Sequence, residues 1–347
     1  MTRLQHLFFT ACFALVLPAV ASAQFYYTGA AGGDFYDEAN WTANADGTGA
    51  NPAGDVLFND AANAIGIDLI IDNDSVVANG QVDFGSGSLM IGNGAEFTIT
   101  GVDNQLDINS ASTFSLMGGT LTVEDDIFFE GDVSFVGGSV TSVADDVEFQ
   151  DNLTSLSIDG TTFTSLADNI VFDAFLGTVN NATFVSADRL GVRNAVAIVM
   201  SDTDIDVQSG LGDVDDVFGA AGLGSSLTLL GASTLLADSV EEEADLILGG
   251  STVATMGGGG ERITADGSTI TMTTTDATLV IASTLVDDPR ADLINGLTGE
   301  SYLDNPSAWT VTDWNGTDEV SLSIVPEPSL LALMVPVGLL LILRRKS

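Results

Sequence analysis

The chain contains 347 residues, with 49 Asp and Glu, 8 Lys and Arg, one His and one Cys. Residues 24–325 hold 4 Arg against 48 acidic residues, a net charge of −44, and contain no Lys, His or Cys. These counts exclude a Cys or His nucleophile, a Cys/His zinc site and a disulfide framework, and they disfavour nucleic acid and anionic membranes as partners. Disorder is disfavoured too, because 45% of the residues are hydrophobic.

Residues 1–23 have the order of parts found in a secretory signal peptide. Arg3 provides a charged start, and a mainly apolar run covers residues 7–17. Small residues precede the expected cleavage point, which is defined by Ala21, Ala23 and Gln24. The mature chain is therefore expected to begin at Gln24, after transport through the Sec translocon.

The next segment contains Asn40-Trp41, followed by Pro52-Ala53-Gly54-Asp55. This order resembles the opening coil of β-helix proteins of the autotransporter-passenger type. The resemblance implies that residues 24–60 form an N-terminal cap that leads into a β-helix.

Residues 61–286 are predicted to form one repetitive β-solenoid. The interior is uniform, since no Pro occurs between Pro52 and Pro289 and no Trp or Tyr between Trp41 and Tyr302. Strands with alternating apolar residues begin 20 to 23 residues apart, at Leu106, Ile127, Val147, Ile170 and Leu190. A second strand follows each of the first four starts after a turn of small residues, with the turns at Gly118, Gly137, Gly160 and Asn181.

A period near twenty with short strands predicts an all-β, right-handed parallel β-helix with terminal caps. About thirteen coils, stacked ~4.8 Å apart, would give a rod of roughly 60 Å. An antiparallel sandwich also has short strands, but it would not explain why corresponding turns share residue types. Later segments predict a tighter repeat, with coil starts at Leu227, Leu246, Ile263 and Leu279.

Acidic residues stand two positions before four of these strand starts, and we call them the acid column: Asp125, Asp145, Asp168 and Asp188. In stacked coils, neighbouring carboxylates ~4.8 Å apart would repel by roughly 0.9 kcal/mol in water. We favour turn chemistry as their role, with each carboxylate accepting backbone N–H groups. The other interpretation is a ladder of calcium ligands, to which Asp126, Asp146 and residues 213–216 would contribute.

No cofactor is expected, and calcium is the one candidate ion. Arg189 and Arg193 are the only close pair of cations in residues 24–325, and we expect them to neutralise Asp188 and the rest of the acid column. Residues 287–325 are predicted to be a linker followed by closing strands, one near Trp309 and one ending at Ile324.

The last segment, residues 326–347, consists of a proline motif, fourteen uncharged residues and a basic tail. Fourteen helical residues reach roughly 21 Å, short of the roughly 30 Å hydrocarbon core. The cations would hold that end in the cytoplasm and leave the preceding chain outside the inner membrane. The residues of the motif and the tail are Pro326, Glu327, Pro328, Arg344, Arg345 and Lys346.

This arrangement closely resembles the PEP-CTERM sorting signal. The resemblance implies recognition by an exosortase, cleavage near Pro326–Pro328, and release or transfer of an inner-membrane-anchored precursor to the cell surface or the exopolysaccharide matrix. An ordinary membrane anchor with a short transmembrane helix is the other interpretation.

The sequence therefore predicts a non-enzymatic, exported structural or adhesion protein of the cell surface or extracellular matrix. One alternative is a glycoside hydrolase that uses paired Asp, although acids are so frequent that none is singled out. Another is an ice-binding surface protein, suggested by the hydroxyl residues Thr120, Thr122, Ser139, Thr141, Thr162, Thr164, Thr271 and Thr273–Thr275.

Overall fold

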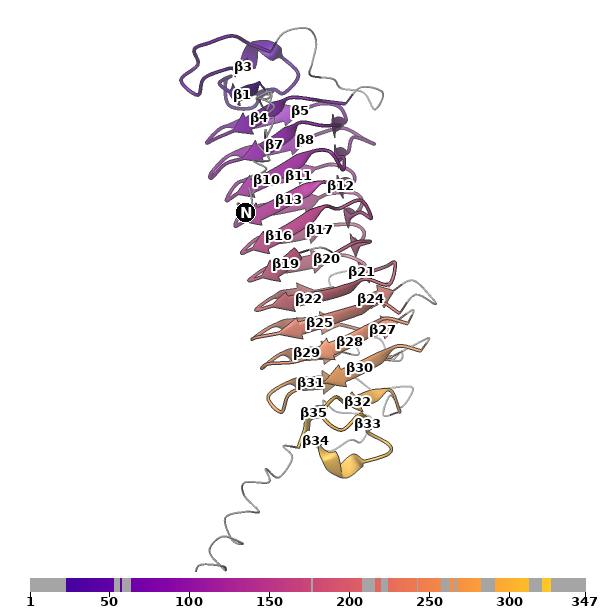
Figure 1. Cartoon of the computed structure of the whole chain (residues 1–347). Coiled ribbons are helices and arrows are strands. Elements are labelled where there is room, and N and C mark those ends of the chain that lie inside the picture. Colours follow the sequence, from indigo (N-terminus) through magenta and orange to yellow (C-terminus); the bar gives the residue numbers. More distant parts are fainter. Residues whose placement is uncertain are drawn as a thin grey trace, which may run out of the picture.

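The computed structural model describes residues 23–52, 57, 64–175, 177–207, 216–219, 224–241, 243–256, 263–264, 267–281, 291–311 and 320–325. This part of the chain is a parallel β-solenoid of about 9 turns (Figure 1). Its helical content is limited to two short 3₁₀ helices, η1 (Glu38–Asn40) and η3 (Pro306–Ala308). The predicted all-β class and parallel solenoid are confirmed.

Three sheets run along the rod, and each turn adds one strand to each sheet over most of its length. In the described residues, sheet A contains β3 (Trp41–Thr42), β1 (Gln24–Tyr27), β4 (Asp68–Ile71), β7 (Ser88–Ile91), β10 (Thr113–Met117), β13 (Asp132–Val136), β16 (Ser155–Asp159), β19 (Gly177–Asn180), β22 (Ala197–Ser201), β25 (Ser226–Leu230), β28 (Asp245–Leu248), β30 (Thr269–Met272), β32 (Leu293–Asn295) and β33 (Glu300–Ser301).

Sheets B and C have the same kind of order over the described ranges. Sheet B contains β2 (Gly33–Asp34), β5 (Ser75–Ala78), β8 (Glu96–Ile99), β11 (Thr120–Val123), β14 (Ser139–Ser142), β17 (Thr162–Ser165), β20 (Thr183–Ser186), β23 (Asp204–Asp206), β26 (Thr234–Ala237), β29 (Val253–Met256), β31 (Thr278–Ile281), β35 (Val320–Ile324) and β34 (Trp309–Val311). Sheet C contains β27 (Ser239–Glu241), β24 (Asp216–Gly219), β21 (Leu190–Val192), β18 (Ile170–Phe172), β15 (Val147–Phe149), β12 (Ile127–Phe129), β9 (Leu106–Ile108) and β6 (Val82–Phe84).

The register of sheet C confirms the repeat predicted for the first half of the rod. The five expected strand starts are parallel partners in one row: Leu106, Ile127, Val147, Ile170 and Leu190. The strands that follow the small-residue turns form a second row in sheet B, through Thr120, Ser139, Thr162 and Thr183.

The tighter repeat expected in the second half is wrong. Leu227 and Leu246 are partners in sheet A, but the next partner of Leu246 is Ile270. Ile263 precedes the bridge from Thr264 to sheet C, and Leu279 belongs to sheet B. All three sheets alternate buried and outward-facing residues, so alternation cannot say to which sheet a strand belongs.

The expectation of about thirteen coils is also too high. The sequence offset between hydrogen-bonded residues of neighbouring turns ranges from 19, between Ser139 and Thr120, to 30, between Thr203 and Ser233. Longer turns in the second half use more residues per coil than a uniform period of twenty would.

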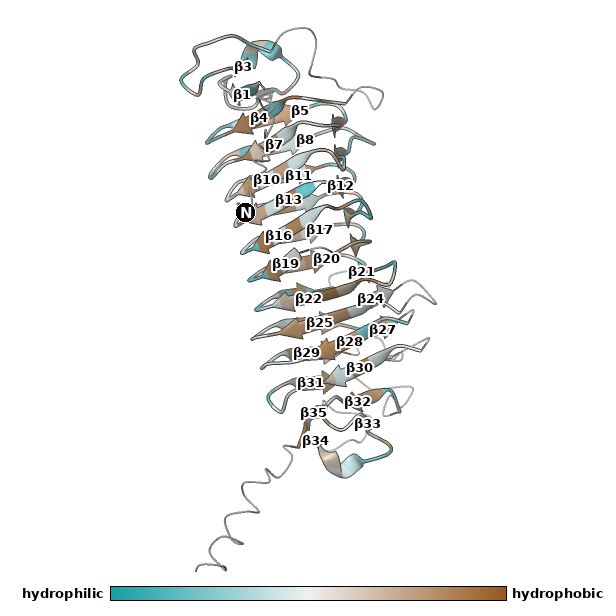
Figure 2. Cartoon of the chain, in the orientation of Figure 1, coloured by the Kyte–Doolittle hydropathy of each residue, from teal (hydrophilic) through white to brown (hydrophobic). Residues whose placement is uncertain are grey.

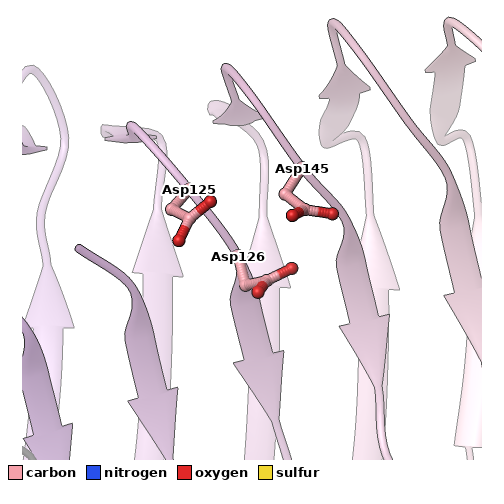
Figure 3. Close-up of side chains that lie close together, drawn as sticks. All are labelled: Asp125, Asp126 and Asp145. Carbon is pink, nitrogen blue, oxygen red and sulfur yellow. The ribbon is translucent and has the colours of Figure 1, made fainter. Parts of the chain in front are cut away.

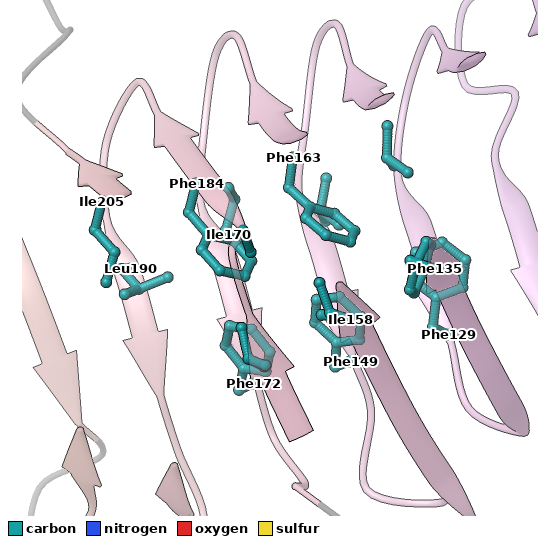
Figure 4. Packing of buried hydrophobic residues seen from close by; sticks show 14 of the residues in the cluster. Phe129, Phe135, Phe149, Ile158, Phe163, Ile170, Phe172, Phe184, Leu190 and Ile205 are labelled. Carbon is teal, nitrogen blue, oxygen red and sulfur yellow. The ribbon is translucent and has the colours of Figure 1, made fainter. Parts of the chain in front are cut away.

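Phenylalanine side chains stack along the interior of the first half (Figure 4). Phe149 and Phe172 are register partners in sheet C, and their rings stack with centroids 4.6 Å apart. Phe163 and Phe184 stack in the same way in sheet B, at 5.2 Å. All four side chains are fully buried, so the hydrophobic effect and ring packing together fix the register of successive turns.

The turn between sheets A and B repeats a backbone conformation. In seven consecutive turns the residue two positions before the sheet B strand has a left-handed φ between 50° and 76°. Gly, Asn and Asp tolerate this conformation best, and they occupy all seven positions: Asn73, Gly94, Gly118, Gly137, Gly160, Asn181 and Asp202. Figure 2 shows the corresponding hydropathy, with hydrophobic residues on strands and hydrophilic residues in turns.

Aromatic residues close the two ends of the described rod. Trp41 is fully buried, donates from Nε1 to the Phe35 carbonyl at 2.8 Å, and packs edge-to-face against Tyr27. β1 already pairs with β4 in parallel, while β3 is antiparallel to β1. At the other end β35 is antiparallel to both β31 and β34, as expected of closing strands.

Both targeting segments fall largely outside the described residues. These are residues 1–22 of the predicted signal peptide and the whole predicted sorting signal, residues 326–347. In the ranges that the structure describes, no helix is long and apolar enough to cross a membrane.

Candidate functional site

The acid column lies in the turns between sheets B and C (Figure 3). Carboxylate oxygens of Asp125, Asp126 and Asp145 lie within 4.8 Å of one another, and so do those of Asp145, Asp146 and Asp168. Asp145 belongs to both groups, so the two groups form a continuous series. Parallel stacking thus brings together acids that are 20 to 23 residues apart in the sequence.

Buried serines hold the backbone of this edge, and we call Ser142, Ser165 and Ser186 the serine column. The Ser142 hydroxyl lies 2.7 Å from the carbonyl oxygens of both Asp125 and Asp145. The Ser165 hydroxyl donates to the Asp145 carbonyl at 2.9 Å and accepts from the Asp168 N–H at 3.2 Å. Each serine therefore joins two successive turns.

We did not identify the serine column from the sequence, although a signal exists there. Ser stands three residues before Asp in Ser142–Asp145 and in Ser165–Asp168, and Ser186 stands two residues before Asp188. Such spacing is typical of a hydroxyl that hydrogen-bonds the backbone of its own turn.

The acids also make the hydrogen bonds that turn chemistry predicts. The Asp146 N–H donates to the Asp145 carboxylate at 3.1 Å. The Asn169 N–H, one turn further on, donates to the Asp146 carboxylate at 2.7 Å. Asp at this edge thus serves the backbone, whatever else it does.

Stacked acids share a cost in protonation. Burial raises the pKa of Asp126 to about 7, and the negative charges of Asp145, Asp125 and Asp146 raise it further. Burial is also the main reason that the pKa values of Asp125, Asp146 and Asp168 are raised. Neighbouring carboxylates cannot all be ionised without repulsion, so this edge binds protons near neutral pH.

The two arginines neutralise only part of this charge. Arg189 forms an ion pair with Asp188 at 3.6 Å, as expected. Arg193 pairs instead with Glu148 of sheet C at 3.8 Å, and its charge lowers the pKa of Asp146. Asp188 lies beside Asp168, because its N–H donates to the Asp168 carbonyl, but it is in neither of the two close groups. Residues 213–215, proposed as further ligands, lie outside the described residues.

A second acidic group on the outer face of sheet C was not predicted. Asp83 and Asp107 are register partners at the middle, outward-facing positions of β6 and β9. Burial raises the pKa of Asp107 to about 6, with contributions from the charges of Asp83 and Glu130. The sequence signal is the middle residue of each three-residue strand, which must face outward when its neighbours face the core.

These groups define what the edge can do chemically. Carboxylate oxygens within 4.8 Å of one another suit a hard cation such as calcium, so the donor type fits. Part of their bonding capacity is already used by backbone N–H groups. Paired carboxylates with one raised pKa also satisfy one requirement for glycoside hydrolysis, but here such pairs recur along an edge.

A different surface lies on sheet B, and we call its six outward-facing residues the hydroxyl face: Thr120, Thr122, Ser139, Thr141, Thr162 and Thr164. They form two rows of register partners on β11, β14 and β17. Thr271 belongs to β30 of sheet A, and Thr273 directly follows that strand. The later threonines suggested by the sequence therefore do not extend these rows.

Comparisons of the chain with protein-family models, with curated proteins and with solved structures find no match. Function is therefore argued from the residues and their geometry.

Proposed function

We propose that this chain is an exported structural or adhesion protein of the cell surface or extracellular matrix, with the solenoid as its rigid body and no enzymatic activity. Its partners during export would be the Sec translocon and an exosortase. The inner-membrane-anchored precursor would then be processed at the proline motif and passed to the cell envelope or exopolysaccharide.

The order of parts in residues 326–347 carries this proposal. The proline triplet, the short apolar run and the basic tail have the sequence expected of a sorting signal. The regular body supports it, because acids, hydroxyls and turns recur along the rod. The right-handed sense of the coil and the two short membrane segments belong to the same proposal, the former because crossovers between parallel strands are almost always right-handed.

Intact-mass measurement of the exported protein tests the proposal. The expected mature chain begins at Gln24 and ends near Pro326. Replacement of Pro326 and Pro328 by Ala should leave the unprocessed tail attached, whereas Pro289→Ala, outside the tail, should leave processing unchanged. An exported wild-type chain that retains Ser347 would contradict the sorting signal and favour an ordinary anchor.

The glycoside hydrolase alternative is favoured by one observation, the raised pKa of Asp126 beside the carboxylate of Asp145. A panel of neutral and acidic polysaccharides separates the two functions. We expect no cleavage. Cleavage that is abolished by Asp126→Asn but not by the change of an exposed acid, Asp151→Asn, would replace the structural proposal with an enzymatic one.

A further inference from the structure

The hydroxyl face carries no charge on a chain that is strongly acidic. All six of its side chains are Thr or Ser. In the same turns, the outward-facing positions of sheet A include Asp132 and Asp159, and sheet C presents Glu148. One border of the face is the glycine turn at Gly118, Gly137 and Gly160, and the other is the acid column. A neutral surface therefore lies beside a strongly anionic edge.

Most hydroxyl groups of this face are not used within the protein. Ser139 donates to Thr120 at 3.4 Å, but Thr122, Thr141, Thr162 and Thr164 make no side-chain hydrogen bond within the described part of the chain. Sheet A contains the contrasting arrangement, in which hydroxyls donate to acids of the preceding turn. Examples are Ser88 with Asp68 at 2.8 Å and Thr269 with Asp245 at 2.6 Å.

The geometry of the face is regular in two directions. Successive turns place register partners ~4.8 Å apart, and residues i and i+2 of one strand lie roughly 6.7 Å apart. Each Thr presents a hydroxyl and a methyl group from a stiff, β-branched side chain. The face is thus a flat grid of donors, acceptors and small apolar groups, without aromatic rings for stacking against single sugars.

We propose that the hydroxyl face is a docking surface for an extended, uncharged, hydroxyl-rich polysaccharide. Charge selects the occupant: the face has no cation for a polyanion, and the adjoining acid column would repel one. A neutral polymer pays no such penalty, and its repeated hydroxyls match a repeated grid. This inference rests on the proposed extracellular role and names the partner for that role.

Cosedimentation of the full-length protein with insoluble polymers tests the proposal. The neutral probes are cellulose and chitin, and carboxymethyl cellulose is the anionic counterpart of the first. Thr141→Glu places a charge at the centre of the face. Ser134→Glu is the matched control, because Ser134 faces outward from sheet A in the same turn. Equal melting temperatures for the two variants would show that both are folded.

We expect wild type to bind a neutral probe more tightly than carboxymethyl cellulose. Thr141→Glu should weaken that binding by about tenfold or more, and Ser134→Glu by less than about twofold, since only the former buries an unpaired charge in the contact. Failure to bind either neutral probe, preference for the anionic polymer, or equal behaviour of the two variants would overturn the inference. Thermal hysteresis without polysaccharide binding would assign the face to ice instead.

The failure of this inference and that of the proposed function are distinguishable. A chain that is exported and processed near Pro326 but does not bind neutral polymers retains its proposed role and loses only this surface. A chain that binds them but keeps its tail contradicts the sorting proposal alone.

Discussion

The two turn edges of the rod repeat one kind of residue at the same place, two positions before a strand, for different physical reasons. At the edge between sheets A and B the repeated feature is a left-handed backbone, for which Gly137 and Gly160 are suited. At the edge between sheets B and C the repeated feature is the carboxylate of Asp145 or Asp168, supported by buried serine hydroxyls. The first repeat is explained by stereochemistry, whereas the second incurs a cost in like-charge repulsion.

The comparison shows that periodicity in a solenoid is not by itself a sign of function. A column of Gly and Asn needs no ligand, because φ alone explains it. A column of Asp that raises the pKa of its members needs a compensating gain, and the observed gain is the set of backbone hydrogen bonds. The four predictions that follow alter one edge and leave the other unchanged.

The largest effect is expected at the A–B edge, from Gly160→Val. A Cβ at this residue would meet no atom closer than 3.9 Å, so the cost is conformational: a β-branched residue at φ +73° should destabilise by about 2 kcal/mol. Gly160→Asn is the control and should cost well under that amount, since Asn181 occupies the same place one turn later. Urea unfolding measures both, and equal losses would contradict the conformational explanation.

The next effect is expected at the B–C edge, from Ser165→Ala. It removes a buried hydroxyl that donates to one turn and accepts from the next, which should cost about 1–2 kcal/mol. Ser157→Ala, at an exposed position of sheet A, should change stability by less than about 0.5 kcal/mol. If the two variants unfold at the same urea concentration, the serine column does not support the acid column.

A pH titration separates the edges further. The folded-state pKa values of Asp126 and Asp107, about 7 and about 6, exceed the ordinary Asp value. Raised acids contribute stability that is present at low pH and is lost as pH rises through the folded pKa. The melting temperature should therefore be higher at pH 5 than at pH 8.

Asp126→Asn should reduce this pH dependence, because it removes one shared proton. Asp151→Asn, an exposed acid in the next sheet C turn, is the matched control and should leave the slope unchanged. A wild-type melting temperature that is flat from pH 5 to pH 8 would show that the stacked acids titrate normally.

The smallest effect concerns ions. Added salt should raise the melting temperature by screening the acid column, and calcium and magnesium should act alike at equal ionic strength, because turn chemistry requires no bound ion. A rise with millimolar calcium that exceeds the rise with magnesium, and that Asp145→Asn abolishes, would establish the calcium ladder. Asp151→Asn should keep any such rise.

Part of the fold could be predicted because stacking preserves residue type. The row from Leu106 to Leu190 was predicted from spacing alone, since each inward position has the same apolar neighbours in the adjacent turns. The sheet of Leu279 could not be assigned, because inward-facing residues of sheets A, B and C obey the same alternation. The acids of the column were identified by position, but their serine supports were not, since a buried Ser and an exposed Ser look alike in a sequence.

The sequence by itself determined an acidic, lysine-free chain with a twenty-residue repeat and a left-handed turn residue in each coil, because composition, alternation and φ preference are local properties. Only the tertiary structure decided which acids share protons, which hydroxyls are left without partners, and that Arg193 pairs with Glu148 rather than with the acid column. These are contacts between residues about twenty or more positions apart, and they depend on the register and length of every intervening turn.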